Sequence, residues 1–185
     1  MRPIRAAIVA LLVGSVVAGW TAVEASDGPP RYLLRMHDAF VLAFVDSEGF
    51  GRTRLTPMQR LRNTYRTGGA TPMWVERLEL IGIAKHDPPQ AFSAGFDAFQ
   101  HPEDSGPRPP RREGRRLSAD ERAALRALES GERLVVRDDA DGLRVVGPIS
   151  AGGECLGCHR GARAGDMLGA LVYTLRPLPA SAPAR

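Results

Sequence analysis

Two thiols and an imidazole lie within five consecutive residues, Cys155-Leu156-Gly157-Cys158-His159. This Cys-x-x-Cys-His pattern is the attachment signature of c-type haem. Two thiols at this spacing can form thioethers with the two vinyl groups on one side of a porphyrin, and the adjacent imidazole then lies beneath the iron. The sequence therefore predicts one covalently attached haem c, held by Cys155 and Cys158, with His159 as the proximal ligand of the iron.

Three other chemistries use closely spaced cysteines, and each lacks a feature that it needs. A thioredoxin-like redox pair requires a strand-to-helix setting in a βαβ unit, which the flanking segments do not predict. A structural zinc site requires a fourth ligand, and the chain has no second Cys-x-x-Cys or closely spaced histidine pair. A disulfide at this spacing is geometrically poor outside redox enzymes. Haem attachment is therefore the favoured interpretation of the motif.

The second axial ligand of the iron is not specified by the motif. In the common small soluble cytochromes c, a methionine follows the motif well downstream, whereas here only 26 residues follow His159. A distal ligand is therefore expected from the predicted helical half of the chain. We favour His37, because it lies on the first long predicted helix, which must pack on the sheet that carries the motif. The other candidates are His86, His101, Met36, Met58, Met73 and Met167.

The N-terminus has the features of an export signal. Arg2 and Arg5 precede an uncharged run of 18 residues from Ala6 to Val23, and small or aliphatic residues follow where a signal peptidase would cleave. We predict a signal peptide over residues 1–25. The alternative is an uncleaved membrane anchor, since such a run is at the lower limit for spanning a bilayer. Both interpretations place the folded part outside the cytoplasm, in the periplasm or otherwise exported, and bacteria attach c-type haem outside the cytoplasmic membrane.

Length and composition predict one folded domain and exclude several classes of protein. The chain has 185 residues, of which 43% are hydrophobic and 25% charged, so it is not collagen-like, fully disordered or a multi-span membrane protein. Its 25 basic residues are interspersed with 21 acidic ones, which does not indicate a nucleic-acid binder. The expected partners are haem and a redox or signalling protein. No acid–base constellation accompanies the motif, so we do not expect an enzyme.

Hydrophobic residues recur at helical spacing in the first half of the chain. We expect a helix over residues 31–50, a second from Thr56-Pro57 to Gly68, and a third from Thr71-Pro72 to Gly82 that carries Trp74, Leu78 and Ile81. A further start signal at residues 87–90 precedes Phe92, Phe96 and Phe99. Residues 101–116 are rich in proline and arginine and are expected to form a solvated loop. Ser118 and Glu121 then form a capping box that begins a helix ending near Gly131.

After Gly131 the hydrophobic period changes to two residues. Residues 133–138 and 143–149 flank an Asp141-Gly142 turn, which predicts a β-hairpin, and residues 167–175 predict a third strand. The fold class is therefore α+β, with N-terminal helices packed on a small antiparallel sheet and the motif between its last two strands. We expect the folded domain to span residues 26–176 and residues 177–185 to form a disordered tail.

Three stretches of the chain resemble a known group. They are Gly147-Pro148-Ile149 leading into the motif, Gly165-Asp166 followed by Leu168-Gly169-Ala170, and an upstream region with Gly51-Arg52-Thr53, Arg62-Asn63 and Thr71-Pro72 before Trp74 and Glu76. These stretches are similar to exported c-type-haem domains with a PAS-like fold, found alone or in bacterial signalling proteins. The resemblance implies a PAS-like sheet and redox or gas sensing. Some members use a cysteine on an N-terminal helix as the distal ligand; none exists here, so His37 or Met36 would replace it.

Two function classes follow from a single covalent haem. The first is a redox or gas sensor module, and the second is a periplasmic electron-transfer cytochrome c, including the four-helix-bundle type whose motif also lies near the C-terminus. Bundle cytochromes have helices on both sides of the motif, whereas the segments that flank it here predict strands. We therefore expect the sensor class.

Overall fold

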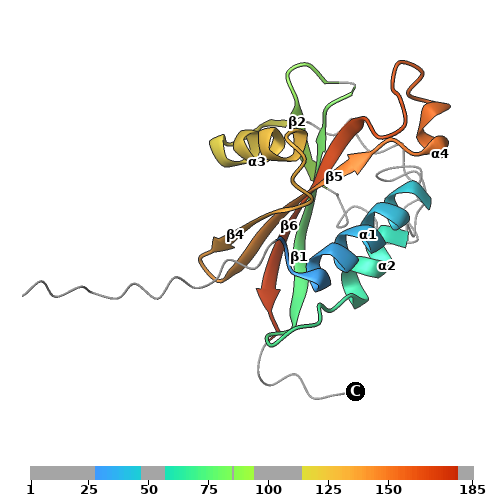
Figure 1. Cartoon of the computed structure of the whole chain (residues 1–185). Helices are drawn as coiled ribbons and strands as arrows, with labels where there is room; N and C mark the ends of the chain where they lie inside the picture. The colour runs from blue at the N-terminus through green and yellow to red at the C-terminus, as the bar shows by residue number, and fades with distance from the viewer. Residues whose placement is uncertain (1–27, 47–56, 85, 94–113, 179–185) are drawn as a thin grey trace, which may run out of the picture.

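A six-stranded antiparallel sheet runs through the molecule in the order β3-β2-β1-β6-β5-β4 (Figure 1). The computed structural model describes residues 28–46, 57–84, 86–93 and 114–178. The strands are β1 (Met73–Gly82), β2 (Gln90–Ser93), β3 (Arg115–Arg116), β4 (Val135–Asp139), β5 (Gly142–Ser150) and β6 (Met167–Pro177). The α+β fold class is confirmed, and the arrangement is consistent with a small PAS-like fold.

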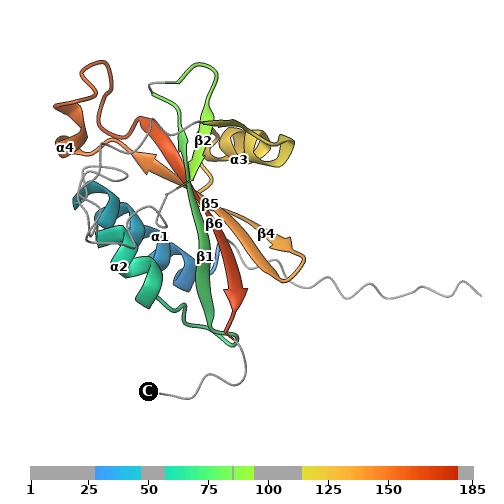
Figure 2. The ribbon, with the colours of Figure 1, turned by 180° about the vertical axis from the view of Figure 1, so that it is seen from behind.

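Helices cover both faces of this sheet (Figures 1 and 2). Helices α1 (Arg31–Asp46) and α2 (Pro57–Thr64) lie on one face, α3 (Ala119–Glu129) lies on the other, and the single turn α4 (Gly153–Leu156) lies between β5 and β6. The buried positions of α1 recur every three or four residues, which produces one apolar face. They are Leu33, Met36, His37, Phe40 and Ala43. The first and last of the longer helices, α1 and α3, were both expected.

The segment expected to form a helix over residues 72–82 is instead the strand β1. Leu78 packs in the core beneath α1, whereas Ile81 packs in the core beneath α3. A strand buried on both faces loses the two-residue alternation that identifies strands in a sequence. In addition, a register irregularity between Val75 and Arg77 puts Val75 and Leu78 in the same core at a helix-like spacing of three residues. The helix prediction was therefore wrong for a physical reason.

The helix start expected at residues 87–90 was also wrong, because residues 90–93 form the strand β2. Phe92 pairs with Leu80 of β1, and Phe96 and Phe99 lie outside the described residues. The predicted hairpin is confirmed as β4 and β5, and the predicted third strand is confirmed as β6. Pro177, expected to begin the disordered tail, is the last residue of β6.

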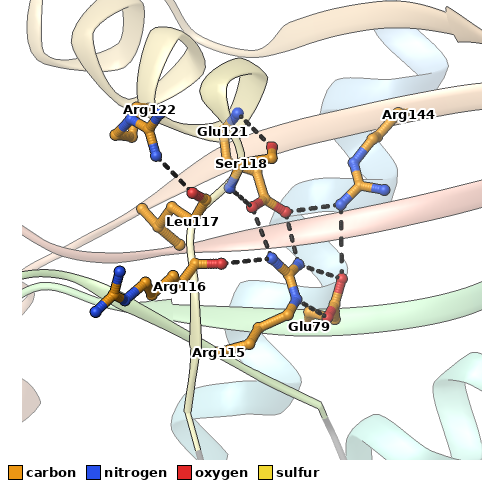
Figure 3. Close-up of polar contacts among 8 residues, drawn as sticks. All are labelled: Glu79, Arg115, Arg116, Leu117, Ser118, Glu121, Arg122 and Arg144. Carbon is orange, nitrogen blue, oxygen red and sulfur yellow. Dashed lines mark hydrogen bonds and ion pairs between the residues drawn. The ribbon is translucent and has the colours of Figure 1, made fainter.

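Arg115 was expected in a solvated loop, but it forms ion pairs with two buried carboxylates on the α3 face of the sheet (Figure 3). Its guanidinium donates to Glu79 of β1 and to Glu121 of α3 at 2.7–3.0 Å. Arg144 of β5 donates to Glu121 at 2.7 Å. Glu79 and Glu121 are 4% and 1% exposed, so each buried charge has an ion-pair partner, as burial requires. The network ties α3 to three strands.

Glu121 has a second role in the same place. Its carboxylate accepts from the Ser118 backbone N–H at 2.8 Å, and the Ser118 hydroxyl accepts from the Glu121 N–H at 3.1 Å. The predicted capping box is thus confirmed. Burial alone would raise the pKa of Glu121, but the hydrogen bonds from Arg115 and Ser118 outweigh burial and lower it to about 2.

Replacement of Glu121 should therefore destabilise the protein in a pH-dependent way. Because its pKa is lower in the folded state than the usual 4.5, the network stabilises the fold above about pH 4.5 and loses this effect as the pH falls toward 2. Glu121→Gln should lower the free energy of unfolding by about 3–5 kcal/mol at pH 7. In urea denaturation, the difference in the free energy of unfolding between Glu121→Gln and the wild type should be smaller at pH 3 than at pH 7.

Asp120→Asn is the matched control for this measurement. Asp120 precedes Glu121 on α3 and forms an ion pair with Arg137, but its side chain is 73% exposed. The control should change the free energy of unfolding by less than about 1 kcal/mol. Equal losses for the two variants would show that burial of the Glu121 network does not stabilise α3.

Candidate haem site

Cys155, Cys158 and His159 lie on the connection between β5 and β6, as predicted, at one end of the sheet (Figure 1). We call residues 151–166 the haem loop. The backbone N–H groups of Cys158 and His159 both donate to the carbonyl of Cys155, at 3.2 and 2.9 Å. The turn that carries all three side chains is therefore held by hydrogen bonds of its own backbone.

The base of the haem loop is closed by two further backbone hydrogen bonds. Ala151 N–H donates to the Asp166 carbonyl at 2.8 Å, and Gly165 N–H donates to the Ala151 carbonyl at 2.9 Å. Asp166 also accepts from the Arg163 N–H through its side chain, at 2.7 Å. The loop thus begins and ends at the same point of the sheet, so its tip is presented on a fixed base.

Both thiols of the haem loop are free, with Cys155 half-buried and Cys158 exposed. Among the described residues, no group of three or more histidine, cysteine, aspartate or glutamate side chains is placed to hold a metal ion. The described part of the chain thus offers no zinc-type ligand cluster. The strands β5 and β6 flank the motif directly, so it lies neither in a thioredoxin-like βαβ unit nor in a four-helix bundle.

His37 is buried in α1, and both of its ring nitrogens have partners. Nε2 lies 2.9 Å from the carbonyl oxygen of Pro148, and Nδ1 lies 2.9 Å from the hydroxyl of Tyr173. A carbonyl can only accept, so Nε2 carries the proton, and Nδ1 of the neutral ring accepts from Tyr173. Burial lowers the pKa of His37 despite the opposing effect of the Pro148 carbonyl, which is consistent with a neutral ring.

This arrangement connects α1 to β5 just before the haem loop. Gly147 makes room for the ring, since a Cβ at that position would lie 2.5 Å from Cε1 of His37. Ligation of iron by His37 stays a prediction, and it would require one of these two hydrogen bonds to break. Tyr173, the partner that completes the arrangement, was not recognised in the sequence because it lies within a continuous apolar strand.

The methionine candidates lie away from the haem loop or within a core. Met36 and Met58 are 0% and 1% exposed, in the core beneath α1. Met73 begins β1 and pairs with Pro177, at the end of the sheet opposite the haem loop. Met167 follows the loop directly but packs against the core beneath α3. His101 lies outside the described residues.

His86 lies on the turn between β1 and β2, beside the base of the haem loop. The N–H groups of Ile83 and Ala84 donate to the carbonyl of Leu168, at 3.3 and 3.2 Å, and Leu168 is two residues beyond Asp166. The imidazole of His86 is half-buried, with its centroid 4.8 Å from that of Phe92. It lies over Gly82, whose added Cβ would be 2.5 Å from Cδ2 of His86.

Two glycines that pair across neighbouring strands lie near the haem loop on the α1 face of the sheet. Gly82 and Gly169 are direct partners across β1 and β6, and Gly169 is also the partner of Ile149 in β5. Side chains alternate along a strand, so both glycines share the face of Leu80 and Leu171, which belong to the core beneath α1. Glycine within strands often marks the close approach of a ligand. The two free thiols and the adjacent imidazole of the loop are the donor set that a haem c requires, so the residues present fit that group.

Comparisons with protein-family models, curated proteins and solved structures give no match to this chain. In the upstream region, the Arg62 guanidinium donates to the backbone carbonyl of Glu76 at 2.5 Å. The predicted signal peptide, residues 1–25, lies outside the described residues. Within the described ranges, no helix has the length and apolar character needed to cross a membrane.

The packing of His37 against β5 predicts the effect of a small substitution. Gly147→Ala would place a methyl group 2.5 Å from Cε1 of His37 and 2.6 Å from Cδ2 of Leu134. Overpacking of this kind costs about 1–3 kcal/mol. Thermal unfolding should show this loss for Gly147→Ala, whereas Gly153→Ala, whose Cβ meets nothing within 4 Å, should stay within about 0.5 kcal/mol. Equal stability of the two variants would contradict the placement of His37.

Proposed function

We propose that this chain is an exported c-type haem protein that carries one covalent haem c and acts as a redox or gas sensor module, not as an enzyme. Cys155 and Cys158 would hold the haem through two thioethers, each formed by addition of an S–H group across a vinyl group, which consumes no oxidant. His159 would supply an imidazole ligand to the iron. The observation that carries the proposal is the complete motif, with both thiols free, on a base-closed loop beside the Gly82–Gly169 pair.

When bound, the haem supplies one-electron chemistry and an iron that can take up small gas molecules. The residues of the chain hold it in place and couple it to the sheet. The haem loop continues directly into β6, the strand that pairs with both β1 and β5. A change in the position of His159 on oxidation or ligand binding would therefore reach the centre of the sheet through covalent connection. This continuity favours a sensor that acts on a redox or signalling partner protein in the periplasm.

Covalent attachment can be tested on protein exported by a host with c-type haem maturation. Thioethers survive acid–acetone extraction, so the haem of the wild-type protein should remain with the polypeptide. The double variant Cys155→Ala with Cys158→Ala should lose it. Gly153→Ala, which changes the same loop but no attachment residue, should retain it. Transfer of all colour from the wild-type protein to the organic phase would rule out a c-type haem.

Hydrogen exchange separates the sensor from an electron-transfer cytochrome. In a sensor, reduction should change the exchange of the Ile83 and Ala84 amides, which donate to Leu168 beside the haem loop, at least several-fold. The amides of α3, on the far face of the sheet, provide the internal control. Identical exchange throughout the oxidised and reduced holo-protein would favour electron transfer without signalling.

A further inference from the structure

The second axial ligand must offer a nitrogen or sulfur lone pair that the fold has not already used. For His37, one nitrogen donates to Pro148 and the other accepts from the fully buried Tyr173. Release of either nitrogen would leave the Pro148 carbonyl or the buried Tyr173 hydroxyl without this partner. The ring also packs closely against Gly147, where an added Cβ would lie 2.5 Å from Cε1 of His37. His37 is therefore committed to holding α1 on β5.

His86 presents the opposite situation. Its imidazole is half-buried and packs on Gly82 and Phe92, with Cδ2 and Nε2 the ring atoms nearest to Gly82. Within the part of the chain that the structure describes, neither ring nitrogen of His86 forms a hydrogen bond. Neutral imidazole is the commonest metal ligand in proteins. The nitrogens of His86 are thus available to a metal.

The position of His86 relative to the haem loop is fixed by backbone hydrogen bonds. Leu168 accepts from Ile83 and Ala84, and Asp166 accepts from Ala151 at the base of the loop. The β1–β2 turn and the haem loop are therefore attached to β6 at sites two residues apart. Figures 1 and 2 show both at the same end of the sheet, with α4 on the side of α1 and α2.

The face of the sheet is also the appropriate one. The ring of His86 lies on the side toward which a Cβ of Gly82 would point, and this is the face of α1. Gly169, the partner of Gly82, is in turn the partner of Ile149, near the start of the haem loop. Met167 directly follows the haem loop in the chain, but it packs on the α3 face. Among the described candidates, His86 alone combines the correct end, the correct face and unused ligand atoms.

We propose that His86 supplies the second axial ligand of the haem attached at Cys155 and Cys158, and that His37 is a positioning residue for strand β5. The inference rests on the proposed function, since it assumes a haem on this loop. It assigns the iron two imidazoles, from His159 and His86, which gives a low-spin iron of low potential. The β1–β2 turn then becomes the second point at which the haem contacts the sheet.

The test compares absorption and electron paramagnetic resonance spectra of oxidised holo-proteins whose haem content is first measured as pyridine haemochrome. The wild type should be low-spin. His86→Ala should become high-spin with its haem retained, and added imidazole should restore the low-spin spectrum. His37→Ala, the matched control, should stay low-spin while its thermal stability falls. His86→Met should stay low-spin, gain a sulfur-to-iron charge-transfer band and have a raised potential.

Several results would overturn the inference. A low-spin spectrum of His86→Ala without added imidazole, or a high-spin wild type, would exclude His86 as the ligand. A high-spin His37→Ala would assign the ligand to His37 instead. If His86→Ala does not accumulate as holo-protein, a His86→Met variant without the sulfur-to-iron band would contradict the proposal equally. Absence of covalent haem from the wild type would be a different failure, since it would overturn the proposed function on which the inference rests.

Discussion

The pairing of β6 with strands on both of its sides is the constraint on which the rest of the structure depends. β6 is hydrogen-bonded to β1 along one edge and to β5 along the other. Because side chains alternate between faces, a shift of one residue in the pairing register of β6 would move each of its side chains to the opposite face of the sheet. Every side chain of β6 would then leave its own core for the other one. Tyr173 would then leave His37, and Gly169 would leave the α1 face. The register of one strand thus sets the positions of the haem loop, the Gly82–Gly169 pair and the side chain that anchors α1.

The two faces of this sheet are secured by different kinds of polar network. On the α1 face, His37, Tyr173 and the Pro148 carbonyl form a neutral chain of hydrogen bonds beside the proposed haem. On the α3 face, two arginines and two glutamates form an ionic network whose formal charges cancel (Figure 3). The charged network lies on the α3 face of the sheet, so it holds α3 there and adds no buried charge to the α1 face.

The parts of the molecule that follow local rules could be predicted from the sequence. The capping box of Ser118, the hairpin before the motif and the position of the motif between the last two strands each depend on residues close in the chain. The predictions that were wrong concern parts of the molecule that depend on residues distant in the chain. β1 was mistaken for a helix because it is buried on both faces and has an irregular register. Arg115 pairs with Glu79, 36 residues away, and His37 pairs with Pro148, 111 residues away.

We propose that Cys155, Cys158 and His159 hold one covalent haem on the loop before β6. Tandem mass spectrometry of a protease digest of the exported protein tests this most directly. The account predicts that the peptide containing residues 155–159 carries the mass of one haem, with the fragment ions placing it across both cysteines. Recovery of that peptide only with free thiols, or only with a Cys155–Cys158 disulfide, from cells that mature other c-type cytochromes would contradict it.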